Sequence, residues 1–123
     1  MKQTYAYNII YTVQFLTHYT YSKTAENHHF ASNVNNTYTE QFKRITDKYG
    51  LDFDGDWNKK MLPHRGRHPN AYHKWVLDQL KIMDDMAQGD TQLFLELFGQ
   101  MVRSPVISNP GMLYSKYWKR MVE

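Results

Sequence analysis

The side chains best suited to chemistry in this chain of 123 residues are its histidines, because five of the six lie between positions 26 and 73. The five are His28, His29, His64, His68 and His73. A neutral imidazole binds transition metals and also exchanges a proton near pH 7. Histidines gathered in this way predict a metal site, a reaction centre, or both.

Cations stand beside the second group of histidines. They are Lys59, Lys60, Arg65 and Arg67. Phosphodiester hydrolysis needs a base for water, positive charge at the phosphate and leaving oxygen, and a group that orients the base. This pattern therefore favours a site that holds a polyanionic backbone. His64 is open between a phosphate-binding role and a simple loop position.

The geometry of a strand limits what adjacent histidines can do. Neighbouring side chains on a strand point to opposite faces, so His28 and His29 can act together only at a strand end or a bulge. One ring would then bind metal while the other faces a phosphate. Further ligands must come from elsewhere, and His68 and His73 flank an expected helix start whose N-terminus would attract a phosphate.

The surrounding elements follow from periodicity and from capping residues. Alternation over 4–16 predicts a strand, with a helix as the alternative, and 17–27 reads as a turn or loop. The other expected elements are a helix over 39–49 capped by Thr39 and ended by Gly50, a short extended piece over 58–63, a helix over 69–87 ended by Gly89, a helix from Asp90 through Val102 stopped by Pro105, and a short basic helix in the tail after Asn109.

Composition restricts the class of protein. The length allows one domain with a single core, and 41% hydrophobic residues favour folding over disorder. Cysteine is absent, so any metal must be held by His, Asp, Glu or Asn. The apolar stretch over 5–16 is too short and too polar for a membrane span, and no small-residue cleavage site for a signal peptide follows it. The net charge of +3 permits a polyanionic partner.

Two motif blocks, in this order, carry a family resemblance. A His-His pair is followed by an Asn and then by Leu-Pro-His-x-Gly-x-His-Pro-x-x-Tyr-His, within about 24–81. The arrangement resembles the AHH family of nucleases, a branch of the HNH/endonuclease VII superfamily found as toxin tips of bacterial polymorphic toxins. The resemblance implies a small, helix-rich α+β domain over 1–123 with a ββα-metal core. It implies that His28 is a metal ligand and that His29 is the general base.

The resemblance also assigns the remaining positions. Asn58 takes the place of the central Asn that steadies the base, and His68 and His73 take the closing metal-binding places. The set expected to bind nucleic acid is Lys59, Lys60, His64, Arg65 and Arg67. The implied activity is cleavage of DNA with one divalent ion, magnesium, zinc, manganese or nickel, and RNA remains the alternative substrate.

A toxin of this family implies a setting as well. An acidic immunity protein would cover the basic site in the producing cell, and the domain would be secreted or delivered and act in the cytoplasm of a target cell. Such toxins carry a long delivery region, so this chain would be an excised toxin domain or an orphan remnant. No membrane partner is expected.

Two positions depart from the family pattern. Asn27 stands where the family has the Ala before the His pair, and Val34 stands where a Lys is expected in the Ser-Asn-x-Asn stretch. The second change removes a cation, which leaves open a nucleic-acid-binding module without catalysis. A separate alternative is that the histidines form a structural zinc site in a protein whose partner is another protein, and the four cations around them count against it.

The remaining candidates have plainer interpretations. Asp52, Asp54 and Asp56 resemble the start of a calcium loop, but Gly55 is misplaced for the EF-hand turn and Pro63 occupies the position of the bidentate Glu. We therefore interpret 52–57 as an acidic turn. His18 stands alone in a tyrosine-rich stretch and is expected to be structural or exposed to solvent.

Overall fold

The computed structural model describes residues 26–62 and 67–122. The strand expected over 4–16 lies outside the described residues, as do His18, His64 and Arg65. The described elements, in chain order, are β1 (Glu26–His29), α2 (Thr39–Thr46), η1 (Asp47–Tyr49), η2 (Asp56–Asn58), β2 (Lys59–Leu62), α3 (Asn70–Ala87), α4 (Thr91–Phe98), η3 (Gly99–Arg103), α5 (Ser104–Ser108), η4 (Pro110–Leu113) and α6 (Ser115–Val122).

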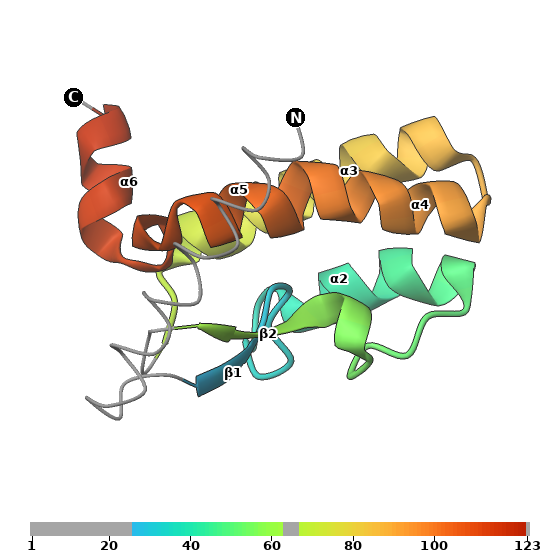
Figure 1. The fold of residues 1–123 in the computed structure, drawn as a ribbon, viewed down its shortest axis with the longest axis horizontal. Coiled ribbons are helices and arrows are strands. Elements are labelled where there is room, and N and C mark those ends of the chain that lie inside the picture. Colours follow the sequence, from blue (N-terminus) through green and yellow to red (C-terminus); the bar gives the residue numbers. More distant parts are fainter. Residues whose placement is uncertain (1–25, 63–66, 123) are drawn as a thin grey trace, which may run out of the picture.

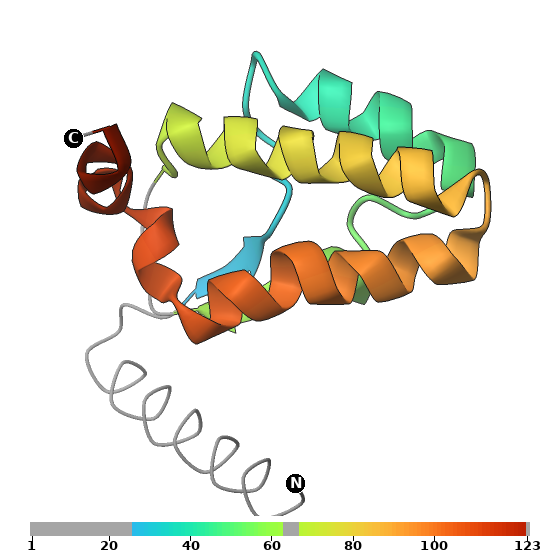
Figure 2. The same cartoon turned by 90° about the horizontal axis from the view of Figure 1, so that it is seen from above.

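The helices and the small sheet form two layers (Figure 1). The upper layer holds α3 and the run from α4 to α5, and the lower layer holds α2 and the two strands. Seen from above, α3 lies between α2 and α4, and it packs on both (Figure 2). Helix α6 lies at the end of the molecule where α3 begins, and it contacts α3. The α+β, mostly helical class expected from the sequence is therefore found.

The two strands pair in antiparallel register. His28 lies opposite Lys60, and His29 lies opposite Lys59. The pair of histidines therefore ends its strand, and each histidine faces a lysine across the ladder. The His-His pair and the start of α3 lie at the same end of the fold, since the ring of His28 is 5.2 Å from that of His68 just before α3.

Helix α2 forms as expected, but its cap differs. Phe42 and Ile45 bury one face of α2 against α3, and Gly50 has the left-handed φ of 65° that ends the segment. Thr39 does not cap the helix. The side-chain oxygen of Asn35 accepts hydrogen bonds from the N–H groups of Thr37 (2.9 Å) and Tyr38 (2.8 Å), because an Asn side chain readily bonds backbone groups two and three residues ahead.

The two following helices begin as predicted. Pro69 precedes the first residue of α3 and has φ −70°, close to the value that its ring imposes. Asp90 caps α4, and its carboxylate accepts a hydrogen bond from the N–H of Leu93 at 3.1 Å. Between them, Gln88 (φ 48°) and Gly89 (φ 88°) both adopt left-handed conformations. Helix α3 therefore ends at Ala87 as predicted, and the left-handed turn that ends it begins at Gln88, one residue before the predicted glycine.

The prediction that Pro105 stops the helix is wrong. The chain continues as a π-helical segment, η3, and then as α5 through Ser108. Pro105 falls in the first turn of α5, where a missing N–H does not break the ladder. Arg103 is the last residue of the π-helical segment, and its guanidinium donates to the backbone carbonyls of Asp56, Trp57 and Lys59 at 3.1–3.3 Å.

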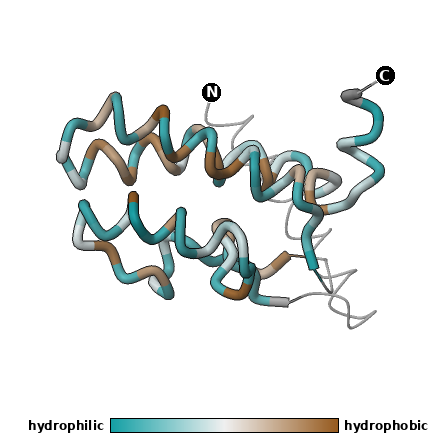
Figure 3. Tube along the Cα trace, turned by 180° about the vertical axis from the view of Figure 1, so that it is seen from behind, coloured by the Kyte–Doolittle hydropathy of each residue, from teal (hydrophilic) through white to brown (hydrophobic). Residues whose placement is uncertain are grey.

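The core lies between the two layers. Its largest fully buried side chains are Tyr72, Phe30, Phe42, Phe94, Phe98, Leu80, Met83, Leu113, Val76, Val102 and Val106. Apolar and polar positions alternate along the helices, as Figure 3 shows, so each helix turns one face to this core. In the part of the chain that the structure describes, no helix is both long enough and apolar enough to cross a membrane.

Tyr49, Lys48 and Asp84 tie the lower layer to α3. The Tyr49 hydroxyl donates to one carboxylate oxygen of Asp84 at 2.6 Å, and the Lys48 ammonium donates to the other at 2.7 Å. Both bonds favour the charged carboxylate and lower the pKa of Asp84 below its usual range, the Lys48 bond most. A carboxyl group whose pKa is lowered by folding stabilises the fold above its unfolded pKa, and that stabilisation is lost as pH falls through the folded pKa.

We predict that Asp84→Ala lowers the free energy of unfolding by about 2 kcal/mol at pH 7, because two hydrogen bonds to one carboxylate are lost. The difference between variant and wild type should begin to shrink as pH falls below the unfolded-state pKa of about 4, and it should be lost as pH falls through the lower pKa of the folded carboxyl. Urea unfolding at several pH values measures both effects. Exposed Asp85→Ala is the control, and a pH-independent cost at position 84 would contradict the linkage.

Candidate active site

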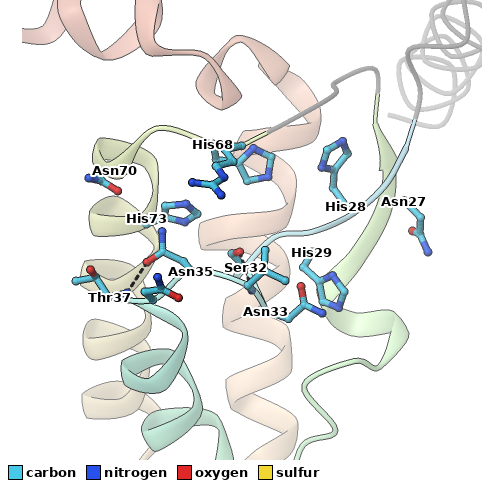
Figure 4. Close-up of a pocket in the computed structure, with 13 residues that line it drawn as sticks. Asn27, His28, His29, Ser32, Asn33, Asn35, Thr37, His68, Asn70 and His73 are labelled. Atoms are coloured by element: carbon cyan, nitrogen blue, oxygen red, sulfur yellow. Dashed lines mark hydrogen bonds between the residues drawn. The ribbon is translucent and has the colours of Figure 1, made fainter.

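A polar pocket of about 770 Å³ lies between the end of β1, the loop after it and the start of α3. Figure 4 shows its histidines converging from different elements. Its lining residues are Asn27, His28, His29, Ser32, Asn33, Val34, Asn35, Asn36, Thr37, Arg67, His68, Asn70 and His73. The two sequence blocks that carry the histidines, about forty residues apart, therefore meet at one site.

Three of the predicted site residues form a row of imidazoles. The ring centroids of His28 and His68 are 5.2 Å apart, and those of His68 and His73 are 5.9 Å apart. His28 comes from the end of β1, His68 precedes α3, and His73 lies on the first turns of α3. The expected ligands from the two blocks are thus neighbours.

His73 is buried in this row. Tyr38 stacks on its ring with centroids 5.8 Å apart, and Phe42 lies beside it at 6.4 Å. Burial lowers the pKa of His73, and the backbone of His68 offsets part of that effect, so the imidazole is neutral near pH 7. Its Nδ1 atom is buried and has no hydrogen-bond partner among the described residues. A neutral imidazole with an unused nitrogen has the chemistry of a metal ligand.

His29 turns to different neighbours. Its Nε2 atom is 2.7 Å from a carboxylate oxygen of Asp54, and its ring stacks on Phe53 with centroids 6.4 Å apart and planes inclined by 16°. The bond to His29 is the main cause that lowers the pKa of Asp54, and the charge of Lys59 adds to it. The strand end therefore sends its two rings to separate partners while both still line the pocket.

Asn58 immediately precedes β2 and is completely buried, at 0% exposure. Its side-chain oxygen accepts from the N–H of Ala31 at 2.8 Å. Its amide group donates to the carbonyls of Ala31 at 3.0 Å and Phe53 at 3.1 Å. The Asn58 backbone carbonyl also accepts from the N–H of Phe30 at 2.7 Å. Asn58 thus acts on the backbone that follows His29, and not on the imidazole itself.

The predicted cations are distributed around this centre. Lys59 and Lys60 pair with the histidines across the sheet, and the ammonium of Lys59 is 3.7 Å from Asp54. Arg67 is exposed and lines the pocket. Val34 also lines the pocket and is 80% exposed, so the position where the family pattern has a Lys faces solvent at the pocket.

A divalent ion is implied by the family pattern, and the residues can be tested against it. Three imidazoles from three segments supply the donors that transition metals prefer, and the unused Nδ1 of His73 points to a missing partner. Over residues 26–62 and 67–122, however, no three His, Asp or Glu side chains stand close enough to hold one ion. The donor chemistry fits, and ligation requires the rings to turn toward a common centre.

Sequence reasoning missed the residues that support the histidines. Asp54 and Phe53 contact His29, Arg103 binds the carbonyls before and in β2, and the Tyr72 hydroxyl donates to the carbonyl of Phe30 at 2.8 Å. The acidic turn was visible in the sequence, but nothing in its spacing indicates that it folds back on the strand that ends at His29. Tyr72 is part of the second motif block and offered the clearest signal.

Comparison with known protein families gives a match over more than half of the chain. A model of the AHH family, described as a nuclease family of the HNH/ENDO VII superfamily with conserved AHH, matches residues 12–100. No curated protein and no solved structure matches the chain. The matched region contains the histidine row, Asn58 and the acidic turn, whereas Arg103 lies beyond it.

We predict that Asn58→Ala destabilises the fold by about 3 kcal/mol, because it leaves the Ala31 N–H and two buried carbonyls without their partner, at about 1–3 kcal/mol for each buried unsatisfied group. Chemical denaturation measures the effect. Asn36→Ala is the control, since Asn36 is exposed and such changes shift stability by about 0.5 kcal/mol or less. Equal stability of the two variants would show that the buried amide does not hold the site together.

Proposed function

This chain belongs to the AHH family of nucleases, and on that premise we propose that it is an endonuclease that hydrolyses DNA phosphodiester bonds with the aid of one divalent metal ion. The observation that carries the proposal is the meeting of His28, His29, His68 and His73 at one polar pocket. Their separate surroundings divide the imidazoles into a row suited to metal and a ring suited to proton transfer.

His29 acts as the general base. It takes a proton from water, and the water oxygen forms a bond to phosphorus while the bond from phosphorus to the 3′-oxygen breaks. The leaving oxygen receives a proton from solvent, so the reaction adds one water across the phosphodiester. His29 is suited to this role because its ring is held by Phe53 and Asp54 and still lines the pocket.

His28, His68 and His73 are the residues proposed to hold the ion. When bound, the metal supplies positive charge to the scissile phosphate and to the leaving oxygen. His73 belongs to the first turn of α3, and its buried ring is covered by Tyr38, so it offers a ligand in a fixed position. His28 is buried at the strand end beside His68, which brings the third donor within side-chain reach.

The cations support a polyanionic substrate. Arg67 stands at the pocket, and Lys60 lies next to His28 across the sheet. His64 and Arg65 belong to the same proposed nucleic-acid-binding set on sequence grounds. Positive charge around a reaction centre steers and holds a phosphate backbone. These contacts do not read bases, so DNA is proposed as the substrate from the family resemblance and RNA is the alternative.

A structural zinc site accounts for the geometry less well. Structural zinc is enclosed by four protein ligands, whereas this histidine row borders a pocket of about 770 Å³. A site with open positions is what a catalytic ion requires, because substrate and water must reach it. The exposed Arg67 at the same pocket has no role in a closed zinc site.

We further propose a biological setting from the family resemblance. The domain acts as an antibacterial toxin that is delivered into the cytoplasm of a target cell, and an acidic immunity protein covers the basic pocket in the producing cell. Charge complementarity to Arg67 and Lys60 supports an acidic partner. Toxicity that depends on His29 would tie this setting to the nuclease.

The first prediction is metal-dependent nicking or degradation of supercoiled plasmid by the purified chain. Activity should appear with one or more of magnesium, manganese, zinc and nickel and disappear with EDTA. His29→Ala should lower the rate by about 10²-fold or more at unchanged metal content, which is the usual effect of removing a general base. Expression of wild type in the bacterial cytoplasm should arrest growth, and expression of His29→Ala should not.

Each result has a definite meaning for the proposal. Intact plasmid with every metal, together with cleaved RNA, would replace DNA by RNA as the substrate. Salt-sensitive binding without cleavage of either nucleic acid would leave the binding-only module. Val34 would then be the first position at which to restore the Lys of the family pattern. Wild-type activity in His29→Ala would remove His29 from the mechanism. Normal growth with an active nuclease would remove the toxin role.

The second prediction concerns metal binding without reference to activity. His73→Ala should weaken binding of the supporting ion by about 10-fold or more, since even residues that only orient a ligand have effects of that size. Titration calorimetry with the metal alone measures it. His29→Ala is the matched control and should bind the ion as wild type does. An affinity of His73→Ala for the ion equal to that of wild type would exclude His73 as a ligand.

A further inference from the structure

We infer that the acidic turn over 52–57 positions His29, with the carboxylate of Asp54 holding its Nε2 nitrogen so that Nδ1 is the atom that receives the proton. The sequence gives this turn no function beyond an acidic connection. The catalytic consequence rests on the proposed nuclease function, whereas the contact between Asp54 and His29 does not. Asp54 is a positioning residue, because it acts through His29.

The turn is rigid enough for this role. The Asp52 carboxylate accepts from the N–H of Asp54 at 3.0 Å, and the Asp52 carbonyl accepts from the N–H of Gly55 at 2.8 Å and from the Trp57 indole at 2.7 Å. A Cβ atom at Gly55 would lie only 2.9 Å from the Trp57 ring, so this close turn requires glycine. These bonds fix the backbone that carries Asp54.

Phe53 places the turn beneath the imidazole. The Phe53 ring is buried and lies nearly parallel to the His29 ring, with 6.4 Å between the two centroids. The ammonium of Lys43, a residue of α2, lies 5.6 Å from the centroid of the Phe53 ring. Adjacent residues of one turn therefore contact the same histidine in two ways. Phe53 limits the tilt of the ring, and Asp54 limits its rotation about the Cβ–Cγ bond.

Asn58 joins the turn to the strand that ends at His29. Its amide bonds the carbonyl of Phe53 on one side and the backbone of Ala31 on the other. The distance between the acidic turn and the end of β1 is therefore set by one buried side chain. The contact between Asp54 and His29 is a consequence of this shared support, and not a chance meeting of two surface groups.

The carboxylate decides which nitrogen is available. An ionised carboxylate only accepts hydrogen bonds, so the Nε2 atom of His29 must carry the hydrogen. In the neutral ring Nδ1 then has the lone pair, and it is the nitrogen that takes the proton from water. The hydrogen on Nε2 stays in place, and Asp54 stabilises the imidazolium while remaining ionised.

The size of the effect follows from the exposure of Asp54. Its side chain is 70% exposed, so solvent screens its charge and orientation is the larger contribution. Loss of a residue that orients a functional histidine costs about 10-fold to 100-fold in activity. An exposed partner should lie at the lower end of that range.

The kinetic test compares three variants in plasmid cleavage. Asp54→Ala should lower kcat about 10-fold with KM unchanged, because it disturbs the base and not the substrate contacts. Asp54→Asn keeps an acceptor oxygen and should restore part of that loss. Asp56→Asn, which removes the same charge from an exposed position two residues away, should match wild type. Equal kcat in wild type and Asp54→Ala would overturn the inference.

A second measurement needs no activity. The imidazole ¹⁵N shifts of the labelled full chain report which ring nitrogen carries hydrogen, and loss of one set of signals in His29→Ala assigns His29. Wild type should show hydrogen on Nε2, and Asp54→Ala should show a mixture of both neutral forms. Identical His29 shifts in the two proteins would overturn the inference. A tautomer change in a chain that cleaves no nucleic acid would sink the proposed function and leave the contact standing.

Discussion

The buried amide of Asn58 is the constraint on which the rest of the site depends. A polar group at 0% exposure is tolerated only when its hydrogen-bonding capacity is used, and Asn58 uses both its oxygen and its amide on backbone groups. Those backbone groups belong to two segments that hold His29, namely the chain directly after β1 and the acidic turn that contacts its ring. A short two-stranded sheet has little stability of its own, so this link, together with Arg103 on the carbonyls leading into β2, makes the strand end a fixed platform.

The alternation of side chains along a strand explains how adjacent histidines serve different purposes. His28 turns toward His68 and the start of α3, and His29 turns toward Phe53 and Asp54. Because the pair ends β1, neither ring is enclosed within a sheet, and both reach the same pocket. Burial favours the neutral imidazole of His73, as its lowered pKa indicates. The cation Arg67, in contrast, is exposed to solvent at the same pocket. Two consecutive residues can therefore supply one ring to the proposed metal site and the other to the proposed base.

Much of this arrangement was accessible from the sequence, because it depends on local signals. The periodicity of α2 and α3, the cap at Asp90 and the pairing of two histidine blocks each involve residues close together or a motif with fixed order. Other features depend on contacts made only in the fold. Thr39 does not cap α2 because its hydroxyl donates to the carbonyl of Ser32 in the preceding loop, while Asn35 binds the N–H groups just before the helix. Pro105 failed to end its helix because a π turn shifted it into a first-turn position, which periodicity does not reveal. Asp54 was assigned to a solvated turn because its partner lies 25 residues away.

Asp54 places a negative charge next to the pocket proposed to bind phosphate, and Lys59 lies close enough to offset that charge. A carboxylate beside the proposed reaction centre would repel a phosphate backbone, and an exposed one would weaken substrate binding. Lys59 stands 3.7 Å from that carboxylate and directly opposite His29 in the sheet, so the negative charge is matched at short range. At distances beyond about 10 Å, where salt screens exposed charges, such a pair contributes little field in either direction. In the proposed nuclease the carboxylate therefore acts on His29 through a short hydrogen bond, while Arg67 and Lys60 remain to attract the substrate. The same site can therefore orient the proposed base and attract the phosphate, because orientation acts through a direct contact and attraction acts over a longer distance.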